Sequence, residues 1–203
     1  MKLKGLDYLD ISSLFSEDEV MIQHSVREFV DNEVTPIIDE HFKNATFPEE
    51  LIPLFAEMNL LGVNLPEEYG CGGMSHVAYG LVCQELERCD SGIRSFVSVQ
   101  GSLVMYPIFA YGSEDQRKKW LPKLASGDAI GCFGLTEPDY GSNPGGMITT
   151  AKKADGGYIL NGAKMWITNG TVADVAVVWA KTDDGVVRGF LVEKGMEGFS
   201  APM

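Results

Sequence analysis

One change of pattern divides the sequence near Ala129, and it limits the fold classes open to the chain. Before this point, apolar residues recur at steps of three to four, the period of an amphipathic helix. After it come short runs rich in β-branched and aromatic residues, separated by Asp-Gly turns, which is typical of strands joined by hairpins. Helices followed by strands indicate an α+β fold. We therefore predict an all-helical domain over residues 1–128 and a β-domain over residues 129–203.

Local signals predict where several helices begin and end. Ser16 and Ser113 are each followed three residues later by Glu or Gln, the pattern of a capping box, and Ser75 can cap a further helix. Pro36 is predicted to bend or end the first helix, and Pro122 to break the last one. Five or so helices joined by short connections imply an antiparallel bundle.

The second part of the chain holds the candidate strands. Turns centred on Gly156 and Gly185 join two pairs of them as hairpins, so we expect an antiparallel sheet. A sheet of this size can leave an edge unpaired, and we predict an incomplete β-domain. The expected strands are Ile130–Thr136, Ile148–Ala154, Tyr158–Thr168, Val175–Thr182 and Val187–Glu193.

Composition and charge exclude several classes of protein. The net charge of -13 argues against a nucleic-acid-binding surface. No apolar run approaches the ~18 residues needed to span a bilayer. The first residues, 1–7, lack the apolar core of a signal peptide and contain an acid where a transit peptide avoids one. We therefore predict a cytoplasmic protein with no membrane span and no nucleic-acid partner.

Cysteine and histidine usage indicates an intracellular chain without a metal site. The four cysteines show no C-x-x-C spacing, which indicates reduced thiols inside a cell. The three histidines are scattered, without the close pairing typical of metal ligands. We predict no metal site.

Two loop-forming stretches, 132–143 and 164–170, are the candidate binding segments. Each begins as an apolar run and ends in residues rich in Gly, Asn, Ser and Thr. Glycines allow a backbone to approach a ligand closely, and the N–H groups and hydroxyls of such loops can hold a phosphate or a heterocycle. Taken alone, each loop is better explained as the turn of a β-hairpin.

Together and in this order, the two loops resemble the flavin-binding segments of the acyl-CoA dehydrogenase family. The resemblance covers nearly the whole chain, and it is closest to the glutaryl-CoA dehydrogenase branch through residues 94–100 and 188–195. It implies the N-terminal helical domain and part of the β-domain of that fold. The C-terminal helical domain of the family has no counterpart in the sequence, so we expect an incomplete enzyme.

The resemblance implies FAD as the cofactor. Thr168 is expected near flavin N5, and Trp166 with Ile167 is expected to form a wall against the ring; the alternative for Trp166 is an ordinary core aromatic. The implied cofactor-binding residues are Phe133, Gly134, Leu135, Thr136, Gly141, Ser142, Trp166, Ile167 and Thr168.

Arg94 is the candidate determinant of substrate choice. A guanidinium with a hydroxyl one helical turn away, at Ser98, suits the capture of a carboxylate. Spacing alone favours a simple ion pair with Glu87 or Asp90. The resemblance instead implies that Arg94 binds the distal carboxylate of glutaryl-CoA, with Glu87 orienting the pocket. The implied substrate-binding residues are Arg94, Ser95, Ser98 and Ser142.

The implied reaction is α,β-dehydrogenation of an acyl-CoA, with or without decarboxylation to crotonyl-CoA. The family's catalytic base is a glutamate of the C-terminal domain, so we assign no catalytic residue and expect no activity without that domain. Glu137 lies beside the first loop, and we interpret it as a turn residue.

The resemblance also implies partners: an electron acceptor such as electron-transferring flavoprotein, and a homo-oligomer or a complementing C-terminal chain. The alternatives are a short-chain acyl-CoA dehydrogenase fragment and a non-catalytic acyl-CoA- or flavin-binding module.

Overall fold

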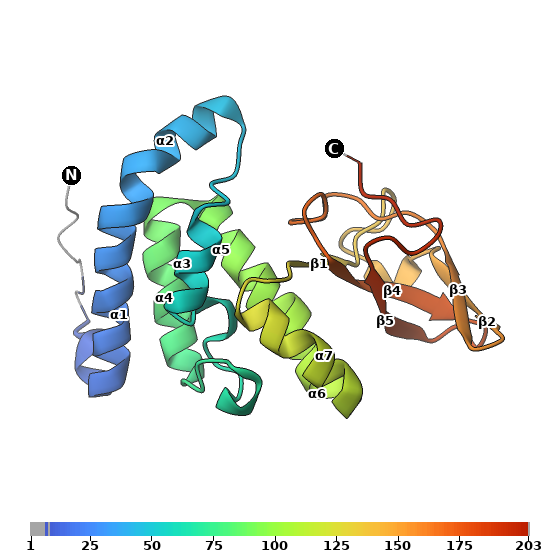
Figure 1. Ribbon diagram of the computed structural model, residues 1–203, viewed down its shortest axis with the longest axis horizontal. Coiled ribbons are helices and arrows are strands. Elements are labelled where there is room, and N and C mark those ends of the chain that lie inside the picture. Colours follow the sequence, from blue (N-terminus) through green and yellow to red (C-terminus); the bar gives the residue numbers. More distant parts are fainter. Residues whose placement is uncertain (1–6, 8, 203) are drawn as a thin grey trace.

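The computed structural model describes residue 7 and residues 9–202. The first residues, 1–6, on which the absence of a signal peptide was judged, lie outside this described part, as do residues 8 and 203. The helices gather on one side of the molecule and the sheet on the other (Figure 1). No helix in the described part is both long and apolar enough to cross a bilayer.

The helical half contains α-helices interrupted twice by π-helical turns. One π-helical segment, η2 (Val30–Val34), joins α1 to α2, and the other, η5 (Val99–Met105), joins α5 to α6. The α-helices are α1 (Glu17–Phe29), α2 (Thr35–Asn44), α3 (Leu51–Glu57), α4 (His76–Cys89), α5 (Ser91–Ser98), α6 (Tyr106–Tyr111) and α7 (Glu114–Ala125).

The predicted helix starts are confirmed. The side chains of Ser16 and Ser113 form capping boxes with Glu19 and Gln116, and each serine accepts a hydrogen bond from the backbone N–H three residues on. Ser75 caps α4 by accepting from the N–H of Ala78 at 3.0 Å.

The two helix prolines behave differently from each other. Pro36 is the second residue of α2, inside a helical run that continues from α1 through η2; its missing N–H removes one hydrogen bond of that run, and α2 is tilted against α1 at this point (Figure 1). Pro122 does not break α7 as predicted, because α7 continues to Ala125. Pro122 lies on the exposed face of the helix, so the carbonyl that loses its partner faces water.

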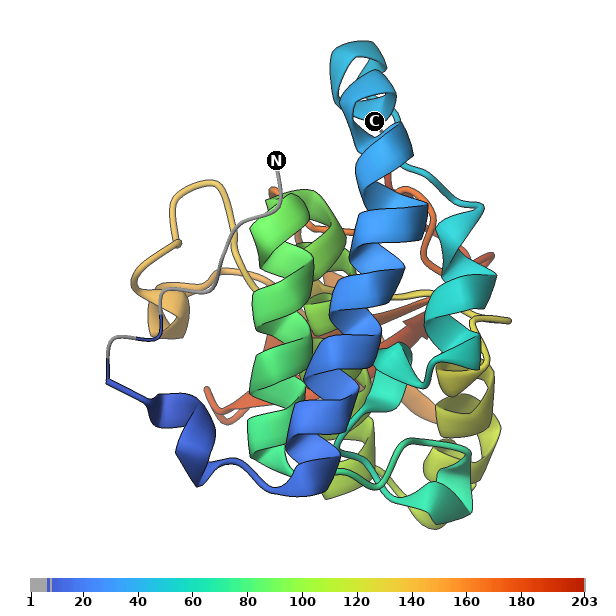
Figure 2. The same cartoon turned by 90° about the vertical axis from the view of Figure 1, so that its left-hand side faces the viewer.

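One apolar core holds the N-terminal helices together. The helix α1 lies alongside α4 (Figure 2), and Phe55 contacts Phe29 edge-on and Phe96 in a tilted arrangement. The fully buried members of this core include Val26, Val30, Val34, Phe55, Leu61, Val82, Leu86 and Val97.

The strands form one mixed sheet of five strands within the described residues. The long strand β4 pairs with β1 and β2 in parallel and with β5 in antiparallel fashion, while β2 and β3 form a hairpin. The prediction of an antiparallel sheet is therefore wrong for two of the four pairings. A long connection precedes β4 and allows this strand to run in the same direction as β1 and β2. The strands are β1 (Gly131–Gly134), β2 (Thr150–Ala154), β3 (Gly157–Asn161), β4 (Val175–Thr182) and β5 (Val187–Glu193).

One expected strand is much shorter than predicted. The run Tyr158–Thr168 is extended and paired only as far as Asn161. Beyond it the chain leaves the sheet, because Met165 N donates to the carbonyl of Thr136 at 2.9 Å and Lys164 is drawn to the first loop. Residues 162–174 form a second loop instead of a strand.

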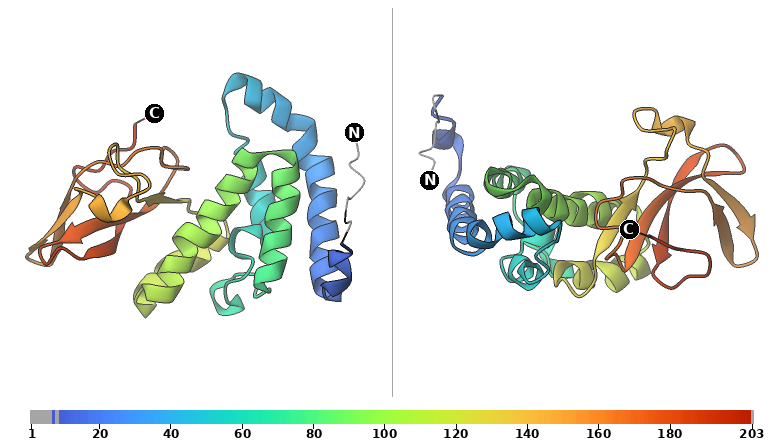
Figure 3. Two further views of the ribbon diagram at one scale, coloured as in Figure 1. Left: turned by 180° about the vertical axis from the view of Figure 1, so that it is seen from behind. Right: turned by 90° about the horizontal axis from the view of Figure 1, so that it is seen from above.

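The two halves share a second core. Val175 and Val177 of β4 face the helices and pack with Val104, Trp120 and Leu124. The alternate residues of β4, Ala176 and Val178, face away from the helices, toward Cys132. Figure 3 shows the sheet lying beyond α6 and α7 from two further directions. One face of the sheet is therefore closed by helices, and the other carries only a small cluster.

Candidate functional site

The two predicted binding loops meet at a small cavity of about 170 Å³. Phe133 and Thr136 reach it from the end of β1 and the first loop, and Trp166, Ile167 and Thr168 reach it from the second loop. The remaining wall comes from η5, through Val99 and Leu103. Five apolar or aromatic residues and two threonines thus contribute to the lining, a composition that suits a flat heteroaromatic ring.

Trp166 is not a core residue. Its side chain is 85% exposed, which excludes the alternative of an ordinary core aromatic. Its backbone has φ of 58°, in the left-handed region that a bulky residue rarely adopts, and Asn169 follows with φ of 66°. Strained, exposed aromatics of this kind are more typical of a binding site than of packing.

A buried ion pair fixes the two loops to each other. Lys164 Nζ lies 2.8 Å from Glu137 Oε1 and donates to the carbonyl of Leu135 at 3.1 Å. Glu137 also accepts from the N–H groups of Ile148 at 2.7 Å and Thr149 at 3.0 Å. The pair therefore holds the second loop against the end of β1.

Glu137 is more than a turn residue. Reciprocal backbone hydrogen bonds with Tyr140 do form the expected turn, but the residue is only 2% exposed. Burial alone would raise the pKa of this carboxyl; the hydrogen bonds from Lys164, Thr149 and Ile148 outweigh it and hold the pKa at about 2. A carboxylate that is this acidic and this fully bonded is a poor proton acceptor.

The other residues of the first loop lie elsewhere. Gly134 closes β1 and lines a different, larger cavity, while Leu135 contributes its carbonyl to Lys164. Gly141 and Ser142 lie in an exposed stretch before a short 3₁₀ turn and line neither of the two cavities described here. The structure therefore brings five of the nine implied cofactor residues to the small cavity: Phe133, Thr136, Trp166, Ile167 and Thr168.

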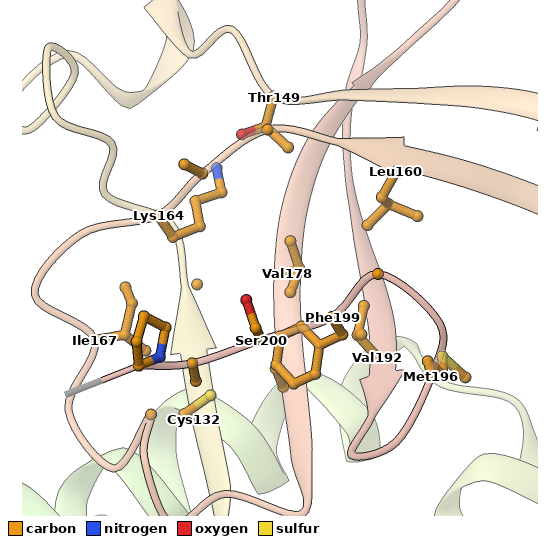
Figure 4. Close-up of a pocket in the computed structure, with 18 of the residues that line it drawn as sticks. Cys132, Thr149, Leu160, Lys164, Ile167, Val178, Val192, Met196, Phe199 and Ser200 are labelled. Atoms are coloured by element: carbon orange, nitrogen blue, oxygen red, sulfur yellow. The ribbon is translucent and has the colours of Figure 1, made fainter.

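The larger cavity, of about 760 Å³, lies on the face of the sheet turned away from the helices (Figure 4). Its floor is made by Cys132, Val178 and Val192, and the segment 196–202 crosses over it, with Phe199 directed inward. Its amine, Lys164 Nζ, is already bonded to Glu137. The rest of the lining is mainly apolar, with Thr149, Glu197 and Ser200 among its polar members.

Arg94, in the middle of α5, is held in an ion pair. Its Nε lies 2.5 Å from Glu87 Oε2, and its Nη1 donates to Ser98 Oγ at 3.3 Å. Asp90 instead caps α5 by accepting from Ile93 N at 2.8 Å. The hydrogen bond to Glu87 raises the pKa of Arg94 and lowers that of Glu87. Of the two ion pairs predicted as alternatives, the one with Glu87 is present.

The position of Arg94 relative to the small cavity follows from the helix. Ser98 accepts from Arg94 and is followed directly by Val99, which lines the cavity. Ser95 offers its carbonyl to Ser98 Oγ at 3.2 Å. The implied substrate residues Arg94, Ser95 and Ser98 therefore lie on the helical segment that continues into the cavity wall, while Ser142 lies on the separate exposed stretch.

Sequence reasoning missed Val99 and Leu103. Both are apolar residues of a helical run, four positions apart, and nothing in their type distinguishes a cavity wall from a core. Within the described residues, no cluster of three or more His, Cys, Asp or Glu side chains is placed to hold a metal, and the four cysteines are free.

Comparisons with known proteins agree with this architecture. The family model "Acyl-CoA dehydrogenase, N-terminal domain" matches residues 16–128, and "Acyl-CoA dehydrogenase, middle domain" matches residues 132–203. The chain is 39% identical over 189 residues to an acyl-CoA dehydrogenase of Bacillus subtilis. The aligned region covers 91% of this chain and 50% of that protein.

Two solved structures are similar over nearly the whole chain. One is a glutaryl-CoA dehydrogenase from Mycobacterium smegmatis in complex with FADH2, with 55% identity, a TM-score of 0.93 and coverage of 97% of this chain and 50% of that one. The other is a butyryl-CoA dehydrogenase from Megasphaera elsdenii, with 32% identity, a TM-score of 0.85 and coverage of 92% and 51%. The chain spans about half the length of these relatives. On the two family models and these likenesses, the chain belongs to the acyl-CoA dehydrogenase family.

Proposed function

We propose that this chain is the FAD- and acyl-binding portion of an acyl-CoA dehydrogenase that acts on glutaryl-CoA. The observation that carries the flavin part is the small cavity, because residues from two loops and a helix converge there around an exposed indole. FAD, when bound, supplies the acceptor for a hydride from the substrate's β-carbon. The likeness to a relative crystallised with FADH2 supports this proposal.

Hydroxyl, aromatic and glycine-rich positions have distinct roles in the proposed cofactor site. Thr136 and Thr168 would supply hydroxyls to the ring from two different loops, while Trp166 and Ile167 would cover one face of it. Gly141 and Ser142 lie in an exposed glycine-rich stretch suited to the diphosphate or the CoA moiety. The full proposed set is Phe133, Gly134, Leu135, Thr136, Gly141, Ser142, Trp166, Ile167 and Thr168.

The preference for a diacid rests on Arg94. Because Nε and Nη1 are used by Glu87 and Ser98, the guanidinium is held in one orientation, and a carboxylate ligand would meet its Nη2 side. We propose Ser95 and Ser98 beside it, and Ser142 at the thioester end, as substrate residues. Because Glu87 already neutralises the guanidinium, the proposed preference rests on the added hydrogen bonds to a distal carboxylate, which an alkyl chain cannot accept.

The base that removes the α-proton is proposed to lie outside this chain. The buried carboxylate at the site, Glu137, is held by Lys164 and by two backbone N–H groups, so it has no free oxygen to accept a proton. We therefore propose that the chain alone binds ligands but turns over slowly or not at all. Electron transfer to an electron-transferring flavoprotein, a homo-oligomer or a complementing chain, a cytoplasmic location and a domain boundary between residues 128 and 129 belong to the same proposal.

A titration of purified chain with FAD tests the cofactor assignment. We expect saturable quenching of flavin fluorescence with one FAD per chain, and weaker binding by Trp166→Ala. Arg188→Ala is the matched control, because Arg188 pairs with Asp184 at the β4–β5 hairpin and neither residue lines the cavity. Absence of binding by the unmodified chain would contradict the cofactor assignment.

A reduction assay tests the substrate assignment. The chain, FAD and the C-terminal half of the Mycobacterium smegmatis relative are mixed with glutaryl-CoA or butyryl-CoA, and loss of the flavin's visible absorption is followed. We expect faster bleaching by glutaryl-CoA, and little bleaching when the C-terminal half is left out. Equal bleaching by both thioesters would favour the short-chain dehydrogenase instead, for which the likeness to the butyryl-CoA dehydrogenase is the supporting observation.

A further inference from the structure

Gly131, the first residue of β1, is bonded by two side-chain amides from different parts of the chain. Its N–H donates to Oε1 of Gln100 at 2.8 Å, and its carbonyl accepts from Nδ2 of Asn169 at 3.2 Å. Gln100 belongs to η5 and Asn169 to the second loop. One residue of the sheet therefore joins the helical half to the loop that carries Trp166.

These amides take the place of a neighbouring strand. The carbonyl of Ile130 accepts from Val175 N on β4, so the groups of the next residue, Gly131, point away from β4. Backbone groups left unpaired and buried would be costly, and the two amides satisfy them. Gln100 is fully buried, and its Nε2 donates to the carbonyls of Leu124 at 3.0 Å and Ala129 at 2.9 Å.

Each of the three walls of the small cavity contains a lining residue within two positions of Gln100, Gly131 or Asn169. Val99 precedes Gln100 on η5, and Phe133 lies two residues after Gly131 on β1. Thr168 precedes Asn169 directly. The fit is tight, because a Cβ on residue 131 would collide with Val104 of η5.

We propose that Gln100 and Asn169 are positioning residues, which hold the three walls of the cavity in register through the N–H and C=O of Gly131. The coupling between the walls is a property of the chain itself. Its consequence for flavin affinity rests on the function proposed above. Neither residue needs to touch the flavin: each acts through the main chain beside a lining residue.

Hydrogen exchange of backbone amides tests the coupling without a cofactor. Gln100→Met keeps the size of the side chain and removes its bonds. We expect the amide of Gly131 to exchange at least tenfold faster, and the amides of Gly170 and Val172, which are bonded within the second loop, to exchange faster with it. Wild-type exchange rates in the loop, together with fast exchange at Gly131, would overturn the proposal.

Asn169→Gly provides the reciprocal test, and it remains usable if Gln100→Met folds poorly. Glycine tolerates the φ of 66° at this position, so the variant removes the amide without adding strain. We expect faster exchange at Gly131 and at the amides of η5. Glu85→Gln is the control: it weakens a buried ion pair in the helical half and should leave the exchange rates of η5, Gly131 and the loop unchanged relative to one another.

FAD affinity and the visible spectrum of the bound flavin give the second readout. We expect each single variant to weaken FAD binding about tenfold and to shift the flavin absorption bands, whereas Glu85→Gln changes neither. Because both amides act on Gly131, the double variant should lose less affinity than the product of the two single losses. Losses that multiply would overturn the proposal. Failure of the unmodified chain to bind FAD would count against the proposed function, while the exchange experiment would still decide the coupling.

Discussion

Among the described residues, the helical half and the sheet half each bury one glutamate, and the two glutamates have different roles. Glu85, 1% exposed, accepts from Arg27 at 2.6 Å and 3.0 Å and from Arg88 at 3.1 Å, which joins α1 to α4 inside the bundle. Glu137, 2% exposed, joins two loops by pairing with Lys164, which lines the larger cavity. The same ion-pair chemistry stabilises a closed core in one half and shapes an open site in the other.

The surroundings explain the difference. The helical core is sealed, with members such as Val30, Phe55 and Leu86 at zero exposure. The sheet is closed by helices on one face only, and its other face carries the larger cavity. A side chain that is removed from the bundle should therefore cost stability alone, whereas one removed from the loops should cost stability and binding together.

The largest expected effect comes from Glu137→Ala. The change leaves the Lys164 amine buried without its counter-charge, bonded to the carbonyl of Leu135, and removes the acceptor of two backbone N–H groups, so we expect a loss of about 3–5 kcal/mol in the free energy of unfolding. Urea denaturation measures the loss, and FAD affinity should fall with it.

Two controls make this comparison sharper. Lys164→Met in the Glu137→Ala background should restore part of the stability, because no buried charge then remains. Glu85→Ala should cost a similar amount of stability while the folded protein keeps its FAD affinity. Equal losses of FAD affinity in both glutamate variants would erase the distinction between the two halves.

Acid should weaken the ion pair between Glu137 and Lys164 over a defined range of pH. The pKa of Glu137 is lowered in the folded chain from 4.5 to about 2, so the stabilisation is complete above pH 4.5 and is lost as the pH falls from 4.5 toward 2. The free energy of unfolding, followed by denaturation between these values, should fall less steeply in Glu137→Gln. Parallel curves for the variant and the unmodified chain would contradict the assignment.

Arg94→Ala tests the substrate end of the site. In the enzyme completed with a C-terminal half, we expect a loss of ~2–5 kcal/mol in transition-state binding for glutaryl-CoA and a far smaller loss for butyryl-CoA. The measurement is kcat/KM for both thioesters. Arg188→Ala should change neither value, and equal losses on the two substrates would rule out the carboxylate role.

Trp166→Ala should separate binding from stability. Because the side chain is 85% exposed, the free energy of unfolding should change by no more than about 0.5 kcal/mol. FAD binding should weaken at least about tenfold, or about 1.4 kcal/mol, since the ring loses its aromatic wall. Unchanged FAD affinity would remove Trp166 from the site.

The smallest expected effect lies in the helical half. Gly80 is an exposed residue inside α4, and a Cβ there would meet no atom within 4 Å. Gly80→Ala should stabilise the chain by about 0.5–1 kcal/mol. Gly70→Ala, at a φ of 79°, should destabilise it instead. FAD affinity should stay constant in both variants.

The elements that depend on local signals could be predicted from the sequence. The caps at Ser16, Ser75 and Ser113 are present, and β4 and β5 have the predicted bounds. The errors occur where distant residues decide. The strand expected to reach Thr168 ends early because Lys164 bonds to Glu137, 27 residues away.

The candidate site divides in the same way. The loops and their aromatic were visible as a pattern of residue types, and five of the implied cofactor residues do line one cavity. The wall from η5 and the link through Gln100 were not visible, because an apolar residue or an amide within a helical run has no local signature of its distant partner.

The location of the flavin can be tested most directly with a chain in which Trp166 is the sole tryptophan, made by Trp120→Phe and Trp179→Phe. The indole of Trp166 is exposed beside the cavity, so its fluorescence should be quenched in proportion to FAD bound, with saturation at one FAD per chain. Binding of FAD with no change in this emission would contradict the proposed site.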